Sequence, residues 1–212
     1  MSPPDPGRAD ESVRVRPAAG LRPFVAHYSG YRQAGAAPAR HRGLPSPYLT
    51  LIFTLNDPLV LESHPDPRQP PGSYLALIGG LHTSPAVVSH QGRQSGIQVG
   101  LRPPGARCLL GVPAGELAGL DLDAADLLGP VEREIRERMR AASHWPERFG
   151  VLDQVLTGRL AAADGYAGVS AEVGSPGAGC WKPGAARSSP SWPRRPAGVT
   201  GTCAQPSGRR SG

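Results

Sequence analysis

The stretch LALIGGLHTSPAVVSHQGRQSGIQVGLRPPGARCLLGVPAGELAGLDLDAADLLG, residues 75–129, decides how the rest of the chain is arranged. Its first half has the short apolar runs and alternation of β-strands, and its second half changes to the spacing of helices. No low-complexity segment separates the two halves. We therefore predict that this stretch joins a β-rich part to a helical part within one folded unit.

Short strands are also predicted on the amino-terminal side of this stretch. Residues 48–55 (YLTLIFTL) are almost wholly apolar, rich in β-branched and aromatic side chains, and followed by the turn Asn56-Asp57-Pro58. Other strands are expected at 21–31, 58–63, 74–78, 85–90 and 95–101, with loops over residues 32–47 and 64–72. Six or seven short strands with frequent turns are typical of an antiparallel sandwich or barrel.

Helices are predicted after residue 103, beginning with short turns at 106–110 and 113–120. Pro130 is expected to begin a helix that ends near residue 142. Ser143 is expected to cap a second helix that reaches about residue 162. The apolar residues that recur at helical spacing are Val131, Ile135 and Met139, then Phe149, Leu152, Leu156 and Leu160. These two segments predict an antiparallel helix pair, and hence an α+β fold class.

The chain therefore divides into four predicted regions. We expect a disordered arm over residues 1–19, a β-rich domain able to enclose a small molecule over 20–102, a helical connector able to pair with a partner over 103–163, and a disordered tail over 164–212. A third of residues 165–212 are Gly or Pro, and no apolar residue repeats there at helical spacing. Such a segment buries too little surface to offset its chain entropy.

Charge and hydropathy exclude some classes of partner. Of the net charge of +6, most comes from residues 165–212, which hold six basic residues and one acidic residue. Residues 1–164 are nearly balanced, with 17 basic and 16 acidic residues, so they offer no basic patch for DNA. No apolar run reaches the roughly 18 residues of a membrane span, and residues 1–10 lack a signal-peptide core. We expect a cytoplasmic protein without membrane contact.

No catalytic motif stands out in the sequence. His41, His82 and His90 are isolated and lack the companion spacing of metal ligands. Residues 100–105 contain glycines but not G-x-G-x-x-G, and no Ser lies in G-x-S-x-G. We therefore expect no enzymatic activity, no cofactor and no metal site.

A binding module remains, namely a β-rich domain able to enclose a small molecule. Tyr48, His82 and Gln98 are polar residues on or near predicted strands, where a barrel interior would use them. We predict them as candidate pocket residues. Ordinary surface or core packing is the alternative role for each of the three.

Four segments resemble one known family along their whole length. They are LRPFVAHYSGYR, ARHRGLPSPYLTLIFTL, GGLHTSPAVVSHQGRQSGIQVGLRPPGARCLLGVPAGELAG and DLLGPVEREIRERM. Over about residues 20–163 the chain is similar to the amino-terminal sensing region of actinobacterial AraC-type transcription regulators. The resemblance implies a cupin-like β domain that senses a small effector, a homodimer, and a DNA-binding domain of two helix-turn-helix units in relatives.

The chain departs from this family where the DNA-binding domain is expected. When each codon of residues 188–208 is read from its third base, one permitted translation is VAELAAEAGWSHRHLRTAFR. This string has two helical patterns around a Gly turn and resembles the first helix-turn-helix of the family. Our hypothesis is a one-base shift near Val173, which leaves the chain with its effector-sensing and dimerisation part and without DNA binding. The alternative is a stand-alone cupin-like binding protein or metal-dependent enzyme that uses His41, His82 or His90.

Overall fold

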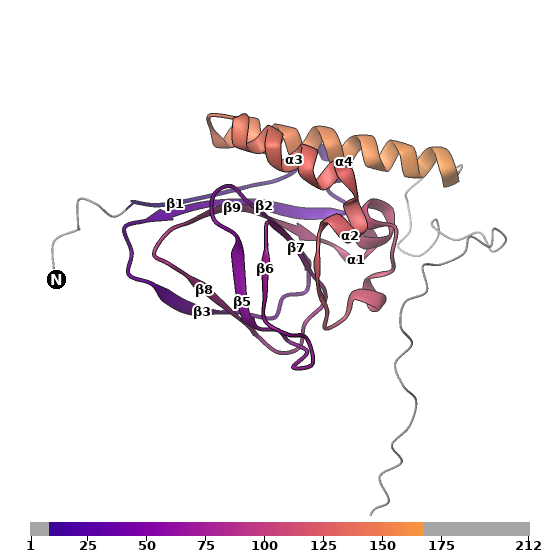
Figure 1. Cartoon of the computed structure of the whole chain (residues 1–212). Helices are drawn as coiled ribbons and strands as arrows, with labels where there is room; N and C mark the ends of the chain where they lie inside the picture. The colour runs from indigo at the N-terminus through magenta and orange to yellow at the C-terminus, as the bar shows by residue number, and fades with distance from the viewer. Residues whose placement is uncertain (1–8, 168–212) are drawn as a thin grey trace, which may run out of the picture. The chain divides into compact units, whose positions relative to one another are not determined.

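Two antiparallel β-sheets and a layer of helices form the part of the chain that the structure, a computed structural model, describes: residues 9–167 (Figure 1). Sheet A has the strand order β1-β2-β9-β4-β7-β10 and sheet B the order β3-β8-β5-β6. The strands of sheet A are β1 (Ala9–Val15), β2 (Val25–Ala34), β4 (Leu49–Thr54), β7 (Ala76–Gly79), β9 (Gln94–Leu101) and β10 (Asp121–Asp123). Those of sheet B are β3 (Ala39–Gly43), β5 (Leu59–Ser63), β6 (Gly72–Tyr74) and β8 (Ala86–His90). The α+β class predicted from the sequence is confirmed.

Most of the helical residues lie in two segments beside sheet A. They are α3 (Pro130–Ala141) and α4 (Trp145–Ala167), which pack against each other and are joined by three residues, 142–144. The shorter turns are η1 (Ala19–Leu21), α1 (Pro103–Gly105), η2 (Ala106–Leu110), η3 (Ala114–Leu117) and α2 (Ala125–Leu128). In Figure 1, α3 and α4 cover one face of sheet A, while sheet B lies across its other face.

The main hydrophobic core lies between sheet A and the helices. Successive side chains of a strand point to opposite faces of its sheet, so alternate residues of β4 and β9 face the helices. The fully buried members of this core on those two strands are Leu49, Leu51, Phe53, Ile97, Val99 and Leu101. The helices contribute Ile135, Met139, Phe149, Leu152 and Leu156. Each fully buried side chain of this kind stabilises the fold by about 1.5–3 kcal/mol relative to leaving it exposed.

Aromatic packing and buried hydrogen bonds attach α4 to sheet A. The Tyr28 ring on β2 stacks on Phe149 with 5.9 Å between centroids, and its hydroxyl donates a 2.9 Å hydrogen bond to Asp153. Trp145 Nε1 donates to Glu11 on β1 at 2.6 Å. Arg148 is buried and donates to the carbonyl of Met139 at 3.1 Å and to that of Ala142 at 2.8 Å. These last two bonds satisfy carbonyl groups at the end of α3, which a helix leaves without internal partners.

Several predicted boundaries are wrong. Residues 9–15 of the expected arm form strand β1, and residues 39–43 of the expected loop form strand β3. Both are polar segments at sheet edges, where pairing with β2 and β8 supplies the order that their own sequences do not signal. Residues 121–123, assigned to the helical connector, form β10 and pair with β7.

The helix predictions agree more closely with the structure. The predicted helix over residues 130–142 is α3, which ends one residue earlier, at Ala141. Helix α4 begins at Trp145 and extends to Ala167, past the predicted end near residue 162. The Ser143 backbone N–H donates to Glu147 at 3.0 Å, so Ser143 takes part in capping through its backbone. The predictions for residues 1–8 and for the tail from 168 to 212 lie outside the described residues.

Within residues 9–167, none of the helices combines the length and the apolar character required to cross a membrane.

The contact between Gly30 and Trp145 gives a test of the packing between sheet A and the helices. A Cβ at Gly30 would lie 2.5 Å from the Trp145 ring, whereas a Cβ at Gly158 on α4 would meet no atom within 4 Å. We expect Gly30→Ala to lower the free energy of unfolding by about 1–3 kcal/mol through overpacking. The control Gly158→Ala should raise it by about 0.5–1 kcal/mol. Urea unfolding of both variants measures these free energies. A Gly30→Ala variant as stable as the unchanged protein would contradict the packing described.

Candidate functional site

The face of sheet A that points away from the helices carries polar side chains and glycines beside the apolar Ile52 and Leu77. Thr50 lies between the core residues Leu49 and Leu51 of β4, and Gln98 lies between Ile97 and Val99 of β9. Alternation along each strand therefore turns Thr50 and Gln98 toward sheet B. Tyr31 on β2 also lines this space between the sheets. This inner face differs sharply from the apolar outer face.

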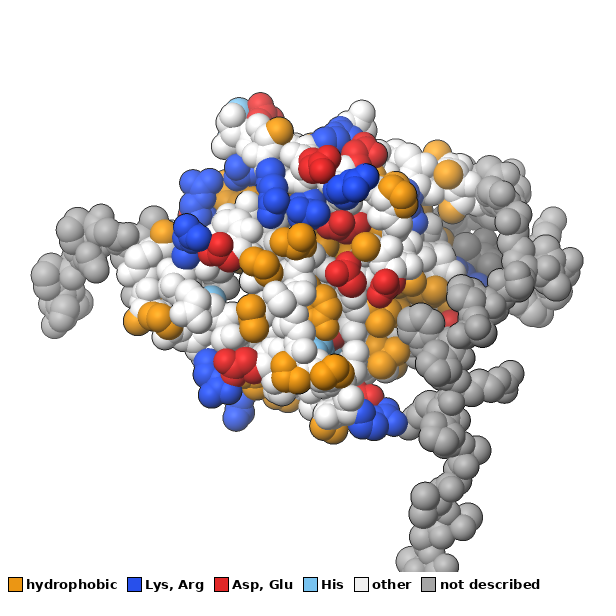
Figure 2. All heavy atoms as spheres, viewed as in Figure 1, with side chains coloured by type: hydrophobic (Ala, Val, Ile, Leu, Met, Phe, Trp, Pro, Cys, Tyr) orange, Lys and Arg blue, Asp and Glu red, His pale blue; other side chains and the backbone are white. Residues whose placement is uncertain are grey.

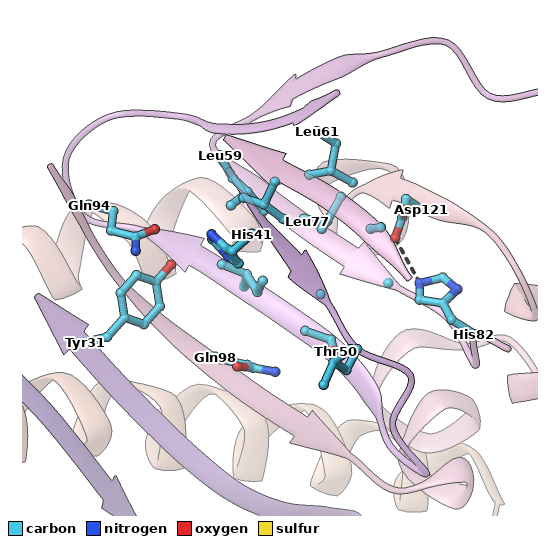
Figure 3. Close-up of a pocket in the computed structure, with 16 residues that line it drawn as sticks. Tyr31, His41, Thr50, Leu59, Leu61, Leu77, His82, Gln94, Gln98 and Asp121 are labelled. Carbon is cyan, nitrogen blue, oxygen red and sulfur yellow. Dashed lines mark hydrogen bonds and ion pairs between the residues drawn. The ribbon is translucent and has the colours of Figure 1, made fainter. Parts of the chain in front are cut away.

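A cavity of about 360 Å³ lies between the two sheets (Figure 3). Its polar lining consists of Tyr31, His41, Thr50, His82, Gln94, Gln98 and Asp121. Its main apolar lining consists of Leu44, Ile52, Leu59, Leu61, Leu77, Ala86 and Val88. Figure 3 shows Tyr31 and Gln94 at one end, His82 and Asp121 at the other, and Gln98 and Thr50 between them. The volume falls within the range of small-molecule pockets.

Four polar side chains of the cavity wall have unused hydrogen-bonding capacity. Within residues 9–167, neither the hydroxyls of Tyr31 and Thr50 nor the polar atoms of His41 and Gln98 form a hydrogen bond. By contrast, the Gln94 amide donates to Gln33 at 3.0 Å. Tyr31, Thr50 and Gln98 are half-buried and His41 is exposed, so these groups are accessible to a ligand. His82 Nδ1 on the same wall is buried without a hydrogen-bond partner among the described residues, and buried polar groups normally find one. The cavity is therefore suited to a molecule that supplies several such partners.

A glycine on β9 creates the space for the Tyr31 hydroxyl. Gly96 is paired with Tyr31 across β2 and β9, and a Cβ at Gly96 would lie only 2.5 Å from the Tyr31 hydroxyl oxygen. Burial raises the pKa of Tyr31 to about 12, so its hydroxyl stays protonated at neutral pH and is able to donate. Burial, with a further contribution from His90, lowers the pKa of His41 and favours its neutral ring. The lining groups near Tyr31 are therefore uncharged.

Asp121 on β10 is held at the far end of the cavity by two histidines. His64 Nδ1 donates to Asp121 Oδ2 at 2.8 Å, and His82 Nε2 donates to Asp121 Oδ1 at 3.1 Å. These donor assignments follow from the fact that an ionised carboxylate only accepts hydrogen bonds. The side chains of His64 and Asp121 are 0% and 2% exposed, so this charge is removed from solvent. Its two hydrogen bonds offset part of the cost of burying it.

Further hydrogen bonds surround the Asp121 cluster, which we define as His64, Asp121 and His82. The Gln69 side chain accepts from the Asp121 backbone N–H at 3.0 Å and donates to its carbonyl at 2.8 Å. The Tyr74 hydroxyl lies 3.4 Å from His64 Nε2. The cluster thus fastens β10 to the loop after β5. Among the described residues, no group of three or more His, Cys, Asp or Glu side chains is arranged to hold a metal ion.

Of the three pocket residues predicted from the sequence, the structure places two in the cavity wall and one outside it. His82 and Gln98 line the cavity. Tyr48 lies outside its wall, with its ring packed edge-on against His27 at 5.7 Å and with Arg102 above it. Of the other histidines considered, His41 lines the cavity, and His90 lines a neighbouring one of about 300 Å³. That any of these residues binds a ligand stays a prediction.

Sequence reasoning missed Tyr31, Thr50 and Asp121. A signal for Thr50 was present, because it lies between Leu49 and Leu51 in a predicted strand, whereas Tyr31 lies between Gly30 and Arg32 at the end of one. No local signal marks Asp121, whose partners come from positions 57 and 39 residues earlier in the chain. Only the folded structure brings that cluster together.

Comparison with known proteins gives one family match. The model of the family described as a domain of unknown function (DUF6597) matches residues 13–123, which is just over half of the 212 residues. The matched segment contains every residue that lines the cavity. No curated protein and no solved structure matches the chain.

The Asp121 cluster can be tested by one isosteric change. Asp121→Asn replaces one of the two acceptor oxygens by an NH₂ group, which would face a histidine N–H. We expect the free energy of unfolding to fall by about 1–3 kcal/mol. The control Asp126→Asn alters an exposed carboxylate on α2 and should change it by less than about 0.5 kcal/mol. Equal effects in urea unfolding would show that Asp121 does not anchor β10.

Proposed function

The chain belongs to the DUF6597 family. We propose that it is the effector-sensing and dimerisation part of an AraC-type transcription regulator. The observation that carries the proposal is the cavity between the sheets, whose wall includes four polar side chains, those of Tyr31, His41, Thr50 and Gln98, without a hydrogen-bond partner within residues 9–167. Sheet A presents this cavity on one face and the α3–α4 pair on the other. The resemblance over residues 20–163 supplies the class of regulator.

A continuous path connects the cavity to the helices. Asp121 lines the cavity, and β10 pairs with β7 in sheet A. Asp123 at the end of β10 accepts a 2.9 Å hydrogen bond from the Ala125 N–H at the start of α2. Helix α2 packs on α3, which packs on α4. An effector that displaces the Asp121 cluster would therefore shift the base of the helix pair, which is how we propose that occupancy is transmitted.

The charged surface of α3 is suited to a homodimer, the assembly that the resemblance implies. Figure 2 shows basic and acidic side chains intermixed over the helical layer on the visible face. Arg138 and Glu134 are paired at 3.0 Å, and Arg133 and Glu137 at 4.0 Å, along exposed positions of α3. Such interleaved charges bring little net repulsion when two copies approach each other. We propose this surface as the one that a second copy contacts.

Under this proposal, DNA binding is a function of the relatives and not of this chain. Residues 165–212 carry the sequence that we interpret as a translation in a shifted frame. Residues 1–164 hold 17 basic and 16 acidic residues, so their net charge supplies little overall attraction for the DNA backbone. We propose that the chain senses and dimerises without binding an operator, and that it would compete with intact subunits.

A second candidate is a stand-alone cupin-like binding protein or metal-dependent enzyme. It is favoured by the presence of His41 and His82 on the wall of one cavity. A metal site there would need a further ligand, and the described residues contain no group of three arranged for a metal ion. Stoichiometric zinc, iron or manganese in the purified protein would favour this candidate over a regulator.

A pair of proteins tests the proposed function. One is the 212-residue chain, and the other is made from the same gene after a one-base change near the Val173 codon that restores the alternate frame. In gel shifts on DNA upstream of the gene, the restored protein should bind specifically, with an affinity that falls steeply as salt rises. The 212-residue chain should not bind specifically.

Two results would contradict this account. Specific binding by the 212-residue chain would show that its tail is functional. Stop codons in the alternate frame, or a restored protein without specific binding, would remove the assignment to a DNA-binding regulator.

A further inference from the structure

We propose that the cavity takes an uncharged ligand with hydrogen-bonding groups along one side and an apolar surface along the other. This inference rests on the sensing function proposed above and names the class of molecule that is sensed. It is carried by three features of the wall, namely its charge, its unpaired polar groups and the separation of its polar from its aliphatic side chains.

The wall of the cavity offers no counter-charge for an anion. No Arg or Lys is among its lining residues, and its one carboxylate, Asp121, would repel a carboxylate or phosphate. Removing such an ion from water without pairing it is costly. The Asp121 side chain is only 2% exposed and lies against His64 and His82, so it presents little surface with which to pair a cation. An uncharged molecule avoids both costs.

The polar side of the wall comes from sheet A. Tyr31 on β2, Thr50 on β4 and Gln98 on β9 line the cavity without forming hydrogen bonds within residues 9–167. Together they offer two hydroxyl groups, which both donate and accept, and one amide with a donor end and an acceptor end. A ligand carrying hydroxyl, carbonyl or amide groups would satisfy them. A hydrocarbon would leave them unpaired at a cost in affinity.

An aliphatic side of the wall comes mainly from sheet B, and Ile52 on β4 and Leu77 on β7 of sheet A adjoin it. Leu59 and Leu61 on β5 and Val88 on β8 line it, and Figure 3 shows the two leucines across the cavity from Gln98 and Thr50. His41 on β3 is the polar exception among these strands, and burial favours its neutral form by lowering its pKa. A molecule with one polar edge and one apolar face therefore matches the two sides of the wall.

Three fragments with one skeleton and different charge test this inference on the full chain. They are 4-hydroxybenzamide, 4-hydroxybenzoate and 4-hydroxybenzylamine, which at pH 7 are neutral, anionic and cationic at the variable group. Binding is followed by NMR chemical-shift changes of the protein on titration. We expect the amide to bind at least about tenfold more tightly than the two charged fragments, because only they bring an uncompensated charge into the cavity.

A matched pair of tyrosine variants shows where the amide binds. Tyr31→Phe removes one hydroxyl from the cavity wall and should weaken amide binding about threefold to tenfold, the usual loss for one hydrogen bond. Tyr48→Phe removes a hydroxyl outside the wall and should leave the affinity unchanged. Thermal unfolding of both variants checks that each is folded.

The outcomes separate this inference from the proposed function. Binding of the benzoate or the benzylamine as tightly as the amide, with the Tyr31→Phe effect retained, would overturn the uncharged class and leave a sensing cavity in place. Equal effects of Tyr31→Phe and Tyr48→Phe would overturn binding at this wall. Binding of none of the three fragments at millimolar concentration would count against both the ligand class and the sensing function.

Discussion

The packing of α3 and α4 on one face of sheet A is the constraint on which the rest of the structure depends. Alternate side chains of each strand point to opposite faces of the sheet. Because the hydrophobic core lies on the outer face, the side chains of the inner face are not needed to form it. The outer residues Leu51, Phe53 and Val99 are fully buried, and the helices cover them. The inner residues Thr50 and Gln98 are free to be polar. The same strands thus stabilise the fold and form a binding wall.

The Asp121 cluster links these two faces. Strand β10 has three residues and pairs with β7 alone, so it has few backbone hydrogen bonds of its own. Side chains of His64, His82 and Gln69 hold it in place from segments far away in the sequence. Directly after β10 the chain enters α2 and α3. A buried carboxylate whose two oxygens both accept hydrogen bonds is held in one geometry, which makes this cluster a suitable point for an effector to act on.

The sequence predicts those parts of the fold that local patterns determine. The strand over residues 48–55 is dense in apolar and β-branched side chains, and the helix from Pro130 has apolar residues at helical spacing, so both are found. Strands β1, β3 and β10 are short or polar and owe their order to partners elsewhere in the chain, so they were missed. The site follows the same rule. Gln98 and His82 lie on the cavity wall, whereas the cluster around Asp121 depends on long-range contacts that no local pattern reveals.

The most direct test is the free energy of unfolding of the double variant Thr50→Val, Gln98→Leu. If these residues form a binding wall with no structural hydrogen bonds, apolar replacements of similar size will leave the stability unchanged or raise it by up to about 2 kcal/mol. Residues kept for binding commonly show this trade between function and stability. A loss of more than about 2 kcal/mol would show that both side chains belong to a structural polar network. That result would contradict the assignment of the inner face of sheet A to ligand binding.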